Sequence, residues 1–238
     1  MPPTPMRFQD RTEAGRLLAE RLAASSIPSP FVVAGIPRGG VIVAQPVAAR
    51  LGAPLTVVHA RKLTLDPASG LALGAVDQDG QVFINSAVAP SLNLDPGVLD
   101  AAEARARAEI RRQKELYRAR PIADFLPGHA VVLVDDGLAT GLTMRAAVAY
   151  VRRLGAKAVY VATPCASSGA AHRFRDETEG FVSLVVDPWF VAVSSYYNLY
   201  PSVSDQEVAA VLGRMEGTAD REKRAHSREG EMPCPPHS

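Results

Sequence analysis

Cysteine, tryptophan and long apolar runs are scarce in this sequence. The 238 residues include 2 cysteines and 1 tryptophan. Cys165 and Cys234 are too few for a disulfide framework, which favours a reducing, cytoplasmic setting. No run approaches the roughly 18 apolar residues of a membrane helix, and residues 1–10 lack the apolar segment of a secretory signal. We therefore expect a cytoplasmic protein that does not bind membranes.

An excess of charge of one sign is also missing. The formal net charge is +1, with 47% hydrophobic and 21% charged residues. This balance provides no basic surface for a nucleic acid and is ordinary for a globular protein. The length suits one α/β domain. We expect that domain over residues 1–215, followed by a polar, disordered tail over residues 216–238.

The most informative stretch runs from Val131 to Thr143. It opens with four apolar residues, most of them β-branched, which predict a strand buried on both faces of a parallel sheet. Asp135 and Asp136 end this strand, and small residues then lead into a predicted helix over residues 144–154. Small residues let backbone N–H groups converge at the helix N-terminus, and such a site binds an anion, most naturally a phosphate.

Two carboxylates beside a phosphate repel it, unless the ligand also carries groups that they bind. A ribose 5-phosphate does so, since its vicinal hydroxyls donate hydrogen bonds to carboxylates. The stretch resembles the 5-phosphoribosyl-1-pyrophosphate (PRPP) motif of type I phosphoribosyltransferases, although Gly137 stands where that family usually has an aliphatic residue. The alternative is an ordinary buried strand ended by solvated acids. The resemblance implies that the 5-phosphate is bound by Leu138, Ala139, Thr140, Gly141, Leu142 and Thr143.

A similar strand, turn and helix lie upstream. Residues 31–36 predict a strand, Arg38, Gly39 and Gly40 lie in the turn, and residues 41–51 predict a helix. Arginine pairs with phosphate through two N–H groups and glycine lets the backbone approach it, which favours a second anion site. The turn resembles the pyrophosphate loop of the family. The alternative is a helix entry with a solvated arginine.

Arg61 and Lys62 follow a third apolar stretch, residues 55–60, which we expect to form a strand. The segment after them contains a predicted hairpin with strands over residues 71–76 and 81–84. A strand that ends in a basic pair and leads into a mobile loop resembles the adenine and orotate members of the family, where these features serve the pyrophosphate and close over the site. Closure is useful because a reactive sugar must be shielded from water. A surface basic pair before a flexible hairpin is the alternative.

A long helix is predicted over residues 98–119. Its acidic and basic side chains recur at a spacing of four residues, as on a solvated helix face. We interpret it as an insertion over the edge of the core, with a solvated charged face.

Downstream of the acidic pair, strands predicted over residues 158–163 and 181–186 alternate with helices over residues 144–154 and 167–176. The alternation implies right-handed crossovers and a parallel sheet. We expect an α/β, Rossmann-like fold with a mainly parallel five-stranded sheet flanked by helices, as in type I phosphoribosyltransferases. Ligands of such sheets bind beyond the carboxyl ends of the strands. Elements of a small cap or hood are expected within residues 1–28, 86–127 and 187–215.

The tryptophan lies in an aromatic segment after the last predicted strand. Aromatic rings can stack on a flat base, and the segment loosely resembles the base-binding segment of hypoxanthine-guanine members, without the acidic residue before its tyrosine. Core packing explains these aromatics equally well. The candidate base-binding residues are Trp189, Phe190 and Val191. A final helix is predicted over residues 204–215, capped by Ser204 with Glu207.

From about Arg7 to Leu212 the order of motifs resembles a group of bacterial phosphoribosyltransferases of unassigned substrate. The resemblance implies Mg²⁺-dependent transfer of the phosphoribosyl group from PRPP to a nitrogen of a nucleobase-like small molecule. Asp135 and Asp136 would hold the ribose hydroxyls and favour positive charge at C1. Mg²⁺ would be carried mainly by PRPP, with the same two carboxylates as candidate protein ligands. The departing pyrophosphate would be bound by Arg38, Gly39, Gly40, Arg61 and Lys62.

Two alternatives stay open at this point. A non-catalytic regulatory protein that binds PRPP or a nucleotide would keep the phosphate loop but lack productive base binding. A hydrolase or phosphotransferase would use Asp135 as its nucleophile or metal ligand. No general base is evident, and His59 is interpreted as a packed core histidine. A homodimer would be ordinary for the resembled family.

Overall fold

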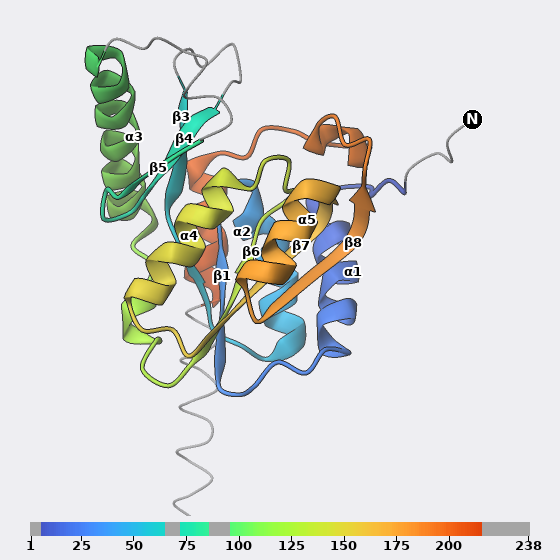
Figure 1. The fold of residues 1–238 in the computed structure, drawn as a ribbon. Coiled ribbons are helices and arrows are strands. Elements are labelled where there is room, and N and C mark those ends of the chain that lie inside the picture. Colours follow the sequence, from blue (N-terminus) through green and yellow to red (C-terminus); the bar gives the residue numbers. More distant parts are fainter. Residues whose placement is uncertain (1–5, 65–71, 86–95, 216–238) are drawn as a thin grey trace, which may run out of the picture.

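The computed structural model describes residues 6–64, 72–85 and 96–215. Its centre is a five-stranded sheet in the order β2-β1-β6-β7-β8, in which every neighbouring pair is parallel (Figure 1). The predicted α/β fold with a parallel five-stranded sheet is therefore confirmed. The strands are β1 (Phe31–Gly35), β2 (Leu55–Val57), β6 (Ala130–Val134), β7 (Ala158–Ser167) and β8 (Gly180–Asp187).

Helices cover both faces of this sheet. In β6, Val131 and Leu133 pack on one side, and Val132 and Val134 on the other. Side chains of a strand alternate between faces, so two covered faces explain why the apolar run is continuous. One face carries α4 (Leu142–Arg153) and α5 (Ser168–Glu177). The other carries α1 (Arg11–Ala23), α2 (Gly39–Leu51) and the helix over residues 205–215.

Helix ends follow local residue chemistry. The carboxylate of Asp10 accepts a hydrogen bond from the N–H of Glu13 at 2.9 Å and so begins α1. Ser204 and Glu207 exchange hydrogen bonds at the start of the helix over residues 205–215, which confirms the predicted capping box.

The predicted hairpin belongs to a second, antiparallel sheet, whose third strand was not expected. The strand predicted over residues 55–60 is confirmed over Leu55–Val57 (β2), but its predicted end is wrong, because the chain leaves the main sheet after β2 and begins β3 (Ala60–Thr64). β3 pairs with β4 (Ala72–Asp77), and β4 pairs with β5 (Val82–Ile84) to form the predicted hairpin. Arg61 and Lys62 therefore lie within a strand of this small sheet and not at the end of a main-sheet strand.

The small sheet exists because both of its faces are covered. Leu63 and Val76 pack against Ile110 of α3 (Pro96–Tyr117), whereas Ala60 and Ala75 pack against α4. Figure 1 shows this sheet and α3 together at one side of the molecule. The position of β3 therefore depends on α3 and α4, which lie far along the chain and cover the two faces of the small sheet.

The interpretation of α3 as a solvated insertion is corrected in part. Its side chains Ala106 and Ile110 are buried, and Arg107 donates a hydrogen bond to the carbonyl oxygen of Gly80 at 2.5 Å. Part of the charged face therefore makes tertiary contacts with the hairpin.

After β8 the chain crosses the carboxyl ends of the strands and returns to the helix over residues 205–215 (Figure 1). This crossing contains η3 (Val193–Tyr196), and Tyr197 forms a parallel bridge with Phe8. No helix in the described part of the chain is long and apolar enough to cross a membrane. Part of the predicted lid (65–71), the loop over 86–95 and the predicted tail (216–238) lie outside the described residues.

Candidate active site

A cavity of about 330 Å³ opens where β1 and β6 end. Its walls also come from β3 and from the first turn of α4, so it lies between the main sheet and the small sheet. The cavity therefore lies beyond the carboxyl ends of the strands, where the ligand is expected to bind. The lining residues are Ile36, Pro37, Ala60, Arg61, Lys62, Thr64, Asp135 and Thr143.

Two helix N-termini at this edge of the sheet lack a side-chain cap. α2 begins after Arg38 and α4 after Gly141, and neither has a side-chain cap hydrogen bond. By contrast, Asp10 caps α1 and Ser167 caps α5. The first-turn N–H groups of a helix have no intrahelical acceptor, so α2 and α4 can offer these groups and their positive dipole ends to an anion.

The loop between β6 and α4 is held by the junction of β7 and α5. The N–H of Leu138 donates to a β7 carbonyl at 2.9 Å, and the Ser167 hydroxyl donates to the carbonyl of Ala139 at 2.6 Å. The N–H of Leu138 is therefore already hydrogen-bonded within the fold, and a role of this residue in binding the 5-phosphate stays a prediction. Thr143 lines the cavity, whereas Thr140 is exposed. The roles of Ala139, Thr140, Gly141 and Leu142 stay predictions.

Gly39 and Gly40 lie in the first turn of α2 and not in the turn before it. A Cβ added at Gly39 would overlap the carboxylate of Asp136, and one added at Gly40 would lie 2.9 Å from Cα of Asp135. Close packing of α2 against the acidic pair thus requires glycine at both positions. Arg38 is exposed and does not line the cavity, and its peptide bond to Pro37 is cis.

The two aspartates lie in different surroundings. Asp135 lines the cavity, and burial together with the charge of Asp136 raises the pKa of its carboxyl well above the usual value. Asp136 does not line the cavity and is 9% exposed. Its Oδ2 accepts hydrogen bonds from Nε of Arg11 at 2.7 Å and from the hydroxyl of Tyr200 at 2.9 Å.

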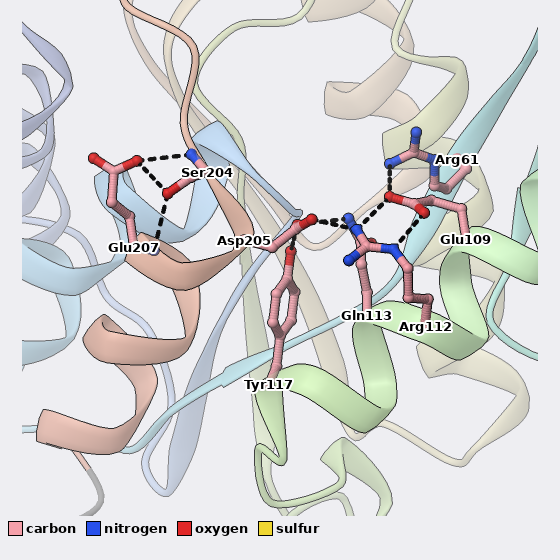
Figure 2. Close-up of polar contacts among 8 residues, drawn as sticks. All are labelled: Arg61, Glu109, Arg112, Gln113, Tyr117, Ser204, Asp205 and Glu207. Carbon is pink, nitrogen blue, oxygen red and sulfur yellow. Dashed lines mark hydrogen bonds and ion pairs between the residues drawn. The ribbon is translucent and has the colours of Figure 1, made fainter.

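Arg61 connects the cavity to a chain of polar contacts (Figure 2). Its Nη1 lies 3.8 Å from Oε1 of Glu109, and Glu109 forms a two-pronged pair with Arg112 at 2.8 Å. The hydrogen bonds from Arg112 lower the pKa of Glu109, which keeps its carboxylate ionised beside Arg61. Arg112 also contacts Asp205, at the start of the helix over residues 205–215. Arg61 is thereby linked through α3 to the last described helix.

The three candidate base-binding residues do not line the cavity. Trp189 is 79% exposed and Val191 is 86% exposed. Phe190 stacks on Tyr196 with 4.9 Å between ring centroids. Core packing, the open alternative for this segment, therefore accounts for Phe190.

His59 is a buried histidine between β2 and β3, next to the residues that line the cavity. Its ring stacks on Tyr117 with 5.6 Å between centroids, and burial lowers its pKa to about 4. The imidazole is therefore neutral at pH 7, and its Nδ1 has no hydrogen-bond partner within the described part of the chain. These observations confirm the interpretation as a packed core residue.

Three residues that contact Asp136 were not among the predicted site residues: Arg11, Tyr197 and Tyr200. One signal could have drawn attention to Arg11: it occupies the first turn of α1, where the helix dipole opposes a positive charge. An arginine at such a position suggests an acidic partner elsewhere in the fold. Tyr197 and Tyr200 belong to the aromatic segment after the last predicted strand, but that pattern did not indicate contacts with Asp136.

Known proteins resemble this chain in sequence and in fold. The model of the phosphoribosyl transferase domain matches residues 10–200. Two Mycobacterium tuberculosis proteins, from strains CDC 1551 and H37Rv, are provisionally named as phosphoribosyl transferases. Each is 40% identical over 207 residues, which cover 87% of this chain and 46% of the relative. The chain thus spans about half the length of these curated relatives.

Two further relatives are informative. An adenine phosphoribosyltransferase of Symbiobacterium thermophilum is 48% identical over 61 residues, which cover 26% of this chain and 36% of that protein. The crystal structure of TT1426 from Thermus thermophilus has 42% sequence identity and a TM-score of 0.69, covering 87% of this chain and 98% of its own.

Proposed function

This chain belongs to the phosphoribosyl transferase family, and on that premise we propose that it transfers the 5-phosphoribosyl group of PRPP to a nitrogen of a nucleobase-like acceptor. The observation that carries the proposal is the cavity itself, in which Asp135, Arg61 and Lys62 lie beside the uncapped N-termini of α2 and α4. PRPP has an anionic group at each end and a ribose with vicinal hydroxyls between them. It therefore matches a site that combines two uncapped helix N-termini, a basic pair and a carboxylate.

The 5-phosphate is assigned to the N-terminus of α4. The first-turn N–H groups of α4 have no side-chain cap, and Thr143 lines the same cavity. Both features favour a phosphate.

The pyrophosphate is assigned to the first turn of α2 and to the basic pair Arg61 and Lys62, which lines the cavity. Two cations beside a leaving group stabilise the negative charge that it gains.

In the transfer step the C1–O bond to pyrophosphate breaks, and both electrons leave with the pyrophosphate. The lone pair of the acceptor nitrogen forms the new C1–N bond, and the proton of that nitrogen passes to a pyrophosphate oxygen or to solvent. Positive charge develops on the ribose, so an ionised Asp135 beside it lowers the barrier. Burial raises the pKa of Asp135, and a cation bound beside its carboxylate would favour the ionised form.

Mg²⁺ fits this site as an ion carried mainly by the ligand. Of the described residues that line the cavity, Asp135 is the one carboxylate, and Mg²⁺ prefers oxygen ligands from a carboxylate combined with phosphates and water. When bound, Mg²⁺ would neutralise charge on the pyrophosphate, with Asp135 as its candidate protein ligand.

A regulatory protein that binds PRPP without turnover is the second candidate. It is favoured by one observation: Trp189, Phe190 and Val191 do not line the cavity. An acceptor site built from these residues is therefore not formed in this structure.

The test is pyrophosphate release from PRPP and Mg²⁺ in the presence of a pool of purine and pyrimidine bases. Asp135→Asn should reduce release at least about 100-fold, the effect of losing two hydrogen bonds to a charged group. The matched control is Asp124→Asn, because Asp124 lies half-exposed in η2 (Ile122–Asp124), and it should release pyrophosphate at the wild-type rate.

Each result has a definite meaning. Release that depends on one base establishes the transferase, and splitting the pool identifies the acceptor. Binding of Mg²⁺ and PRPP without release favours the regulatory protein. If the wild-type protein neither binds PRPP nor releases pyrophosphate, the proposal is wrong.

A further inference from the structure

The carboxylate of Asp136 is enclosed by three separate parts of the chain. Arg11 of α1 and Tyr200 of the crossing after β8 both donate to its Oδ2, at 2.7 Å and 2.9 Å. Gly39 of α2 lies so close that an added Cβ would overlap the same oxygen. Asp135, the neighbouring residue, has a side chain that lines the cavity instead.

Arg11 is held in place by several contacts besides its pair with Asp136. Its Nη1 donates to the carbonyl of Pro201 at 2.7 Å, and its guanidinium carbon lies 3.8 Å from the ring centroid of Tyr200. Burial opposes the charge of Arg11, but Asp136 and Tyr200 outweigh burial and raise its pKa. The guanidinium is therefore permanently charged and needs its carboxylate partner.

The backbone of Asp136 is fixed from the same side. The hydroxyl of Tyr197 donates to the carbonyl oxygen of Asp136 at 2.6 Å. Both the main chain and the side chain of Asp136 are thus bound by the crossing after β8. If the carboxylate turned towards a ligand, Arg11 would remain buried without its counter-charge, which is strongly unfavourable.

We propose that Asp136 is a positioning residue, which Arg11 and Tyr200 hold so that Asp135 alone contacts the ribose. The inference deepens the proposed function and rests on it. Both carboxylates were predicted to hold the ribose hydroxyls, whereas here Asp135 binds the ribose and Asp136 positions the loop. Asp136 ties α1, α2 and the crossing to the loop after β6. Asp135 is thereby presented to the cavity in one orientation.

The test compares the affinity for Mg²⁺-PRPP, measured by calorimetry well below the unfolding midpoint of every variant. Asp135→Asn should weaken binding about 100-fold, as expected for lost hydrogen bonds to a charged group. Arg11→Met should weaken it about tenfold, the low end for removing a residue that helps to orient a binding group. Asp136→Asn and the double variant Arg11→Met/Asp136→Asn should match Arg11→Met, because all three remove the same pair.

Two further variants keep the test interpretable. Tyr200→Phe removes one hydrogen bond to Asp136 and should fold even if Arg11→Met does not; it should weaken binding about threefold. Arg50→Met makes the same change as Arg11→Met at an exposed pair with Glu20, and should bind PRPP like the wild type.

The possible failures are distinct. A loss of affinity in Asp136→Asn as large as in Asp135→Asn would mean that Asp136 contacts the ribose directly, and it would overturn the inference alone. Unchanged affinity in both Arg11→Met and Tyr200→Phe would reduce the pair to a structural role and would also overturn it. No PRPP binding by the wild type would overturn the proposed function, and the inference with it.

Discussion

Gly137 directly follows the acidic pair, and Val193 of η3 packs so close to it that no side chain fits there. A Cβ at position 137 would overlap Cγ1 of Val193 and would lie 2.7 Å from Cγ2 of the same residue and 3.0 Å from Sγ of Cys165. The departure from an aliphatic residue at this position therefore has a structural reason. The crossing after β8 places its own aliphatic side chain over the loop and leaves no room for a second.

Gly137→Ala should lower the free energy of unfolding by about 1–3 kcal/mol, the usual cost of an overpacked methyl group. Val193→Ala in the same chain should recover most of that loss, because it removes the atoms that the new Cβ meets. Denaturant unfolding measures both. The control is Gly213→Ala, where an added Cβ meets no atom within 4 Å. An equal loss in Gly137→Ala with and without Val193→Ala would contradict the explanation.

At the scale of elements, Asp205 joins the last described helix to α3. This buried carboxylate accepts hydrogen bonds from the hydroxyl of Tyr117 and from Nε2 of Gln113 at 3.2 Å, and it also pairs with Arg112 (Figure 2). α3 carries the small sheet and the last helix packs on the main sheet, so one side chain holds two halves of the fold together. Burial alone would raise the pKa of Asp205, but these hydrogen bonds outweigh burial and lower it.

Asp205→Asn should therefore lower the free energy of unfolding by about 1–3 kcal/mol at pH 7. The pKa is lower in the folded state than the usual 3.8 of the unfolded chain, so the carboxylate contributes its full stability above that value. The contribution falls as the pH drops through the folded-state pKa. The difference between wild type and variant should shrink accordingly below about pH 4.

Denaturant unfolding at pH 7 and at pH 3 tests this pattern. Glu20→Gln, at the exposed pair with Arg50, should leave stability nearly unchanged at both values. If Asp205→Asn lowers the free energy of unfolding as much at pH 3 as at pH 7, the charge of Asp205 does not contribute to stability.

At the scale of the whole molecule, the cavity is shared by two sheets. β3 supplies Arg61 and Lys62, whereas the ends of β1 and β6 supply Pro37 and Asp135. A ligand that contacts both walls has to bind them in one arrangement, so it should couple the openings of the two sheets.

Mg²⁺-PRPP should slow amide hydrogen exchange in β3 and in the first turn of α4 together. At a ligand concentration 100 times the dissociation constant, the slowing should approach about 100-fold for openings that release the ligand. Amides at the carboxyl end of α5, away from the cavity, should exchange at an unchanged rate. Protection of α4 without β3 would mean that the small sheet does not take part in binding.

The sequence determined what depends on local pattern. The continuous apolar run of Val131–Val134 predicted a strand covered on both faces, and Ser204 with Glu207 predicted a helix start, because strand periodicity and capping act over a few neighbouring residues. The motif of Asp135 and Asp136 predicted a site at the end of that strand, since parallel strands present their carboxyl ends at one edge.

Tertiary structure alone decided how these pieces meet. The chain switches to a second sheet at Ala60 because α3 and α4, distant in sequence, cover its two faces. Tertiary structure also gives Asp135 and Asp136 different surroundings, although the sequence does not distinguish them. The partner of Asp136 is Arg11, which lies 125 residues earlier in the chain. Partner choice over such separations depends on which buried charges must be neutralised and which faces covered, and no local pattern contains that information.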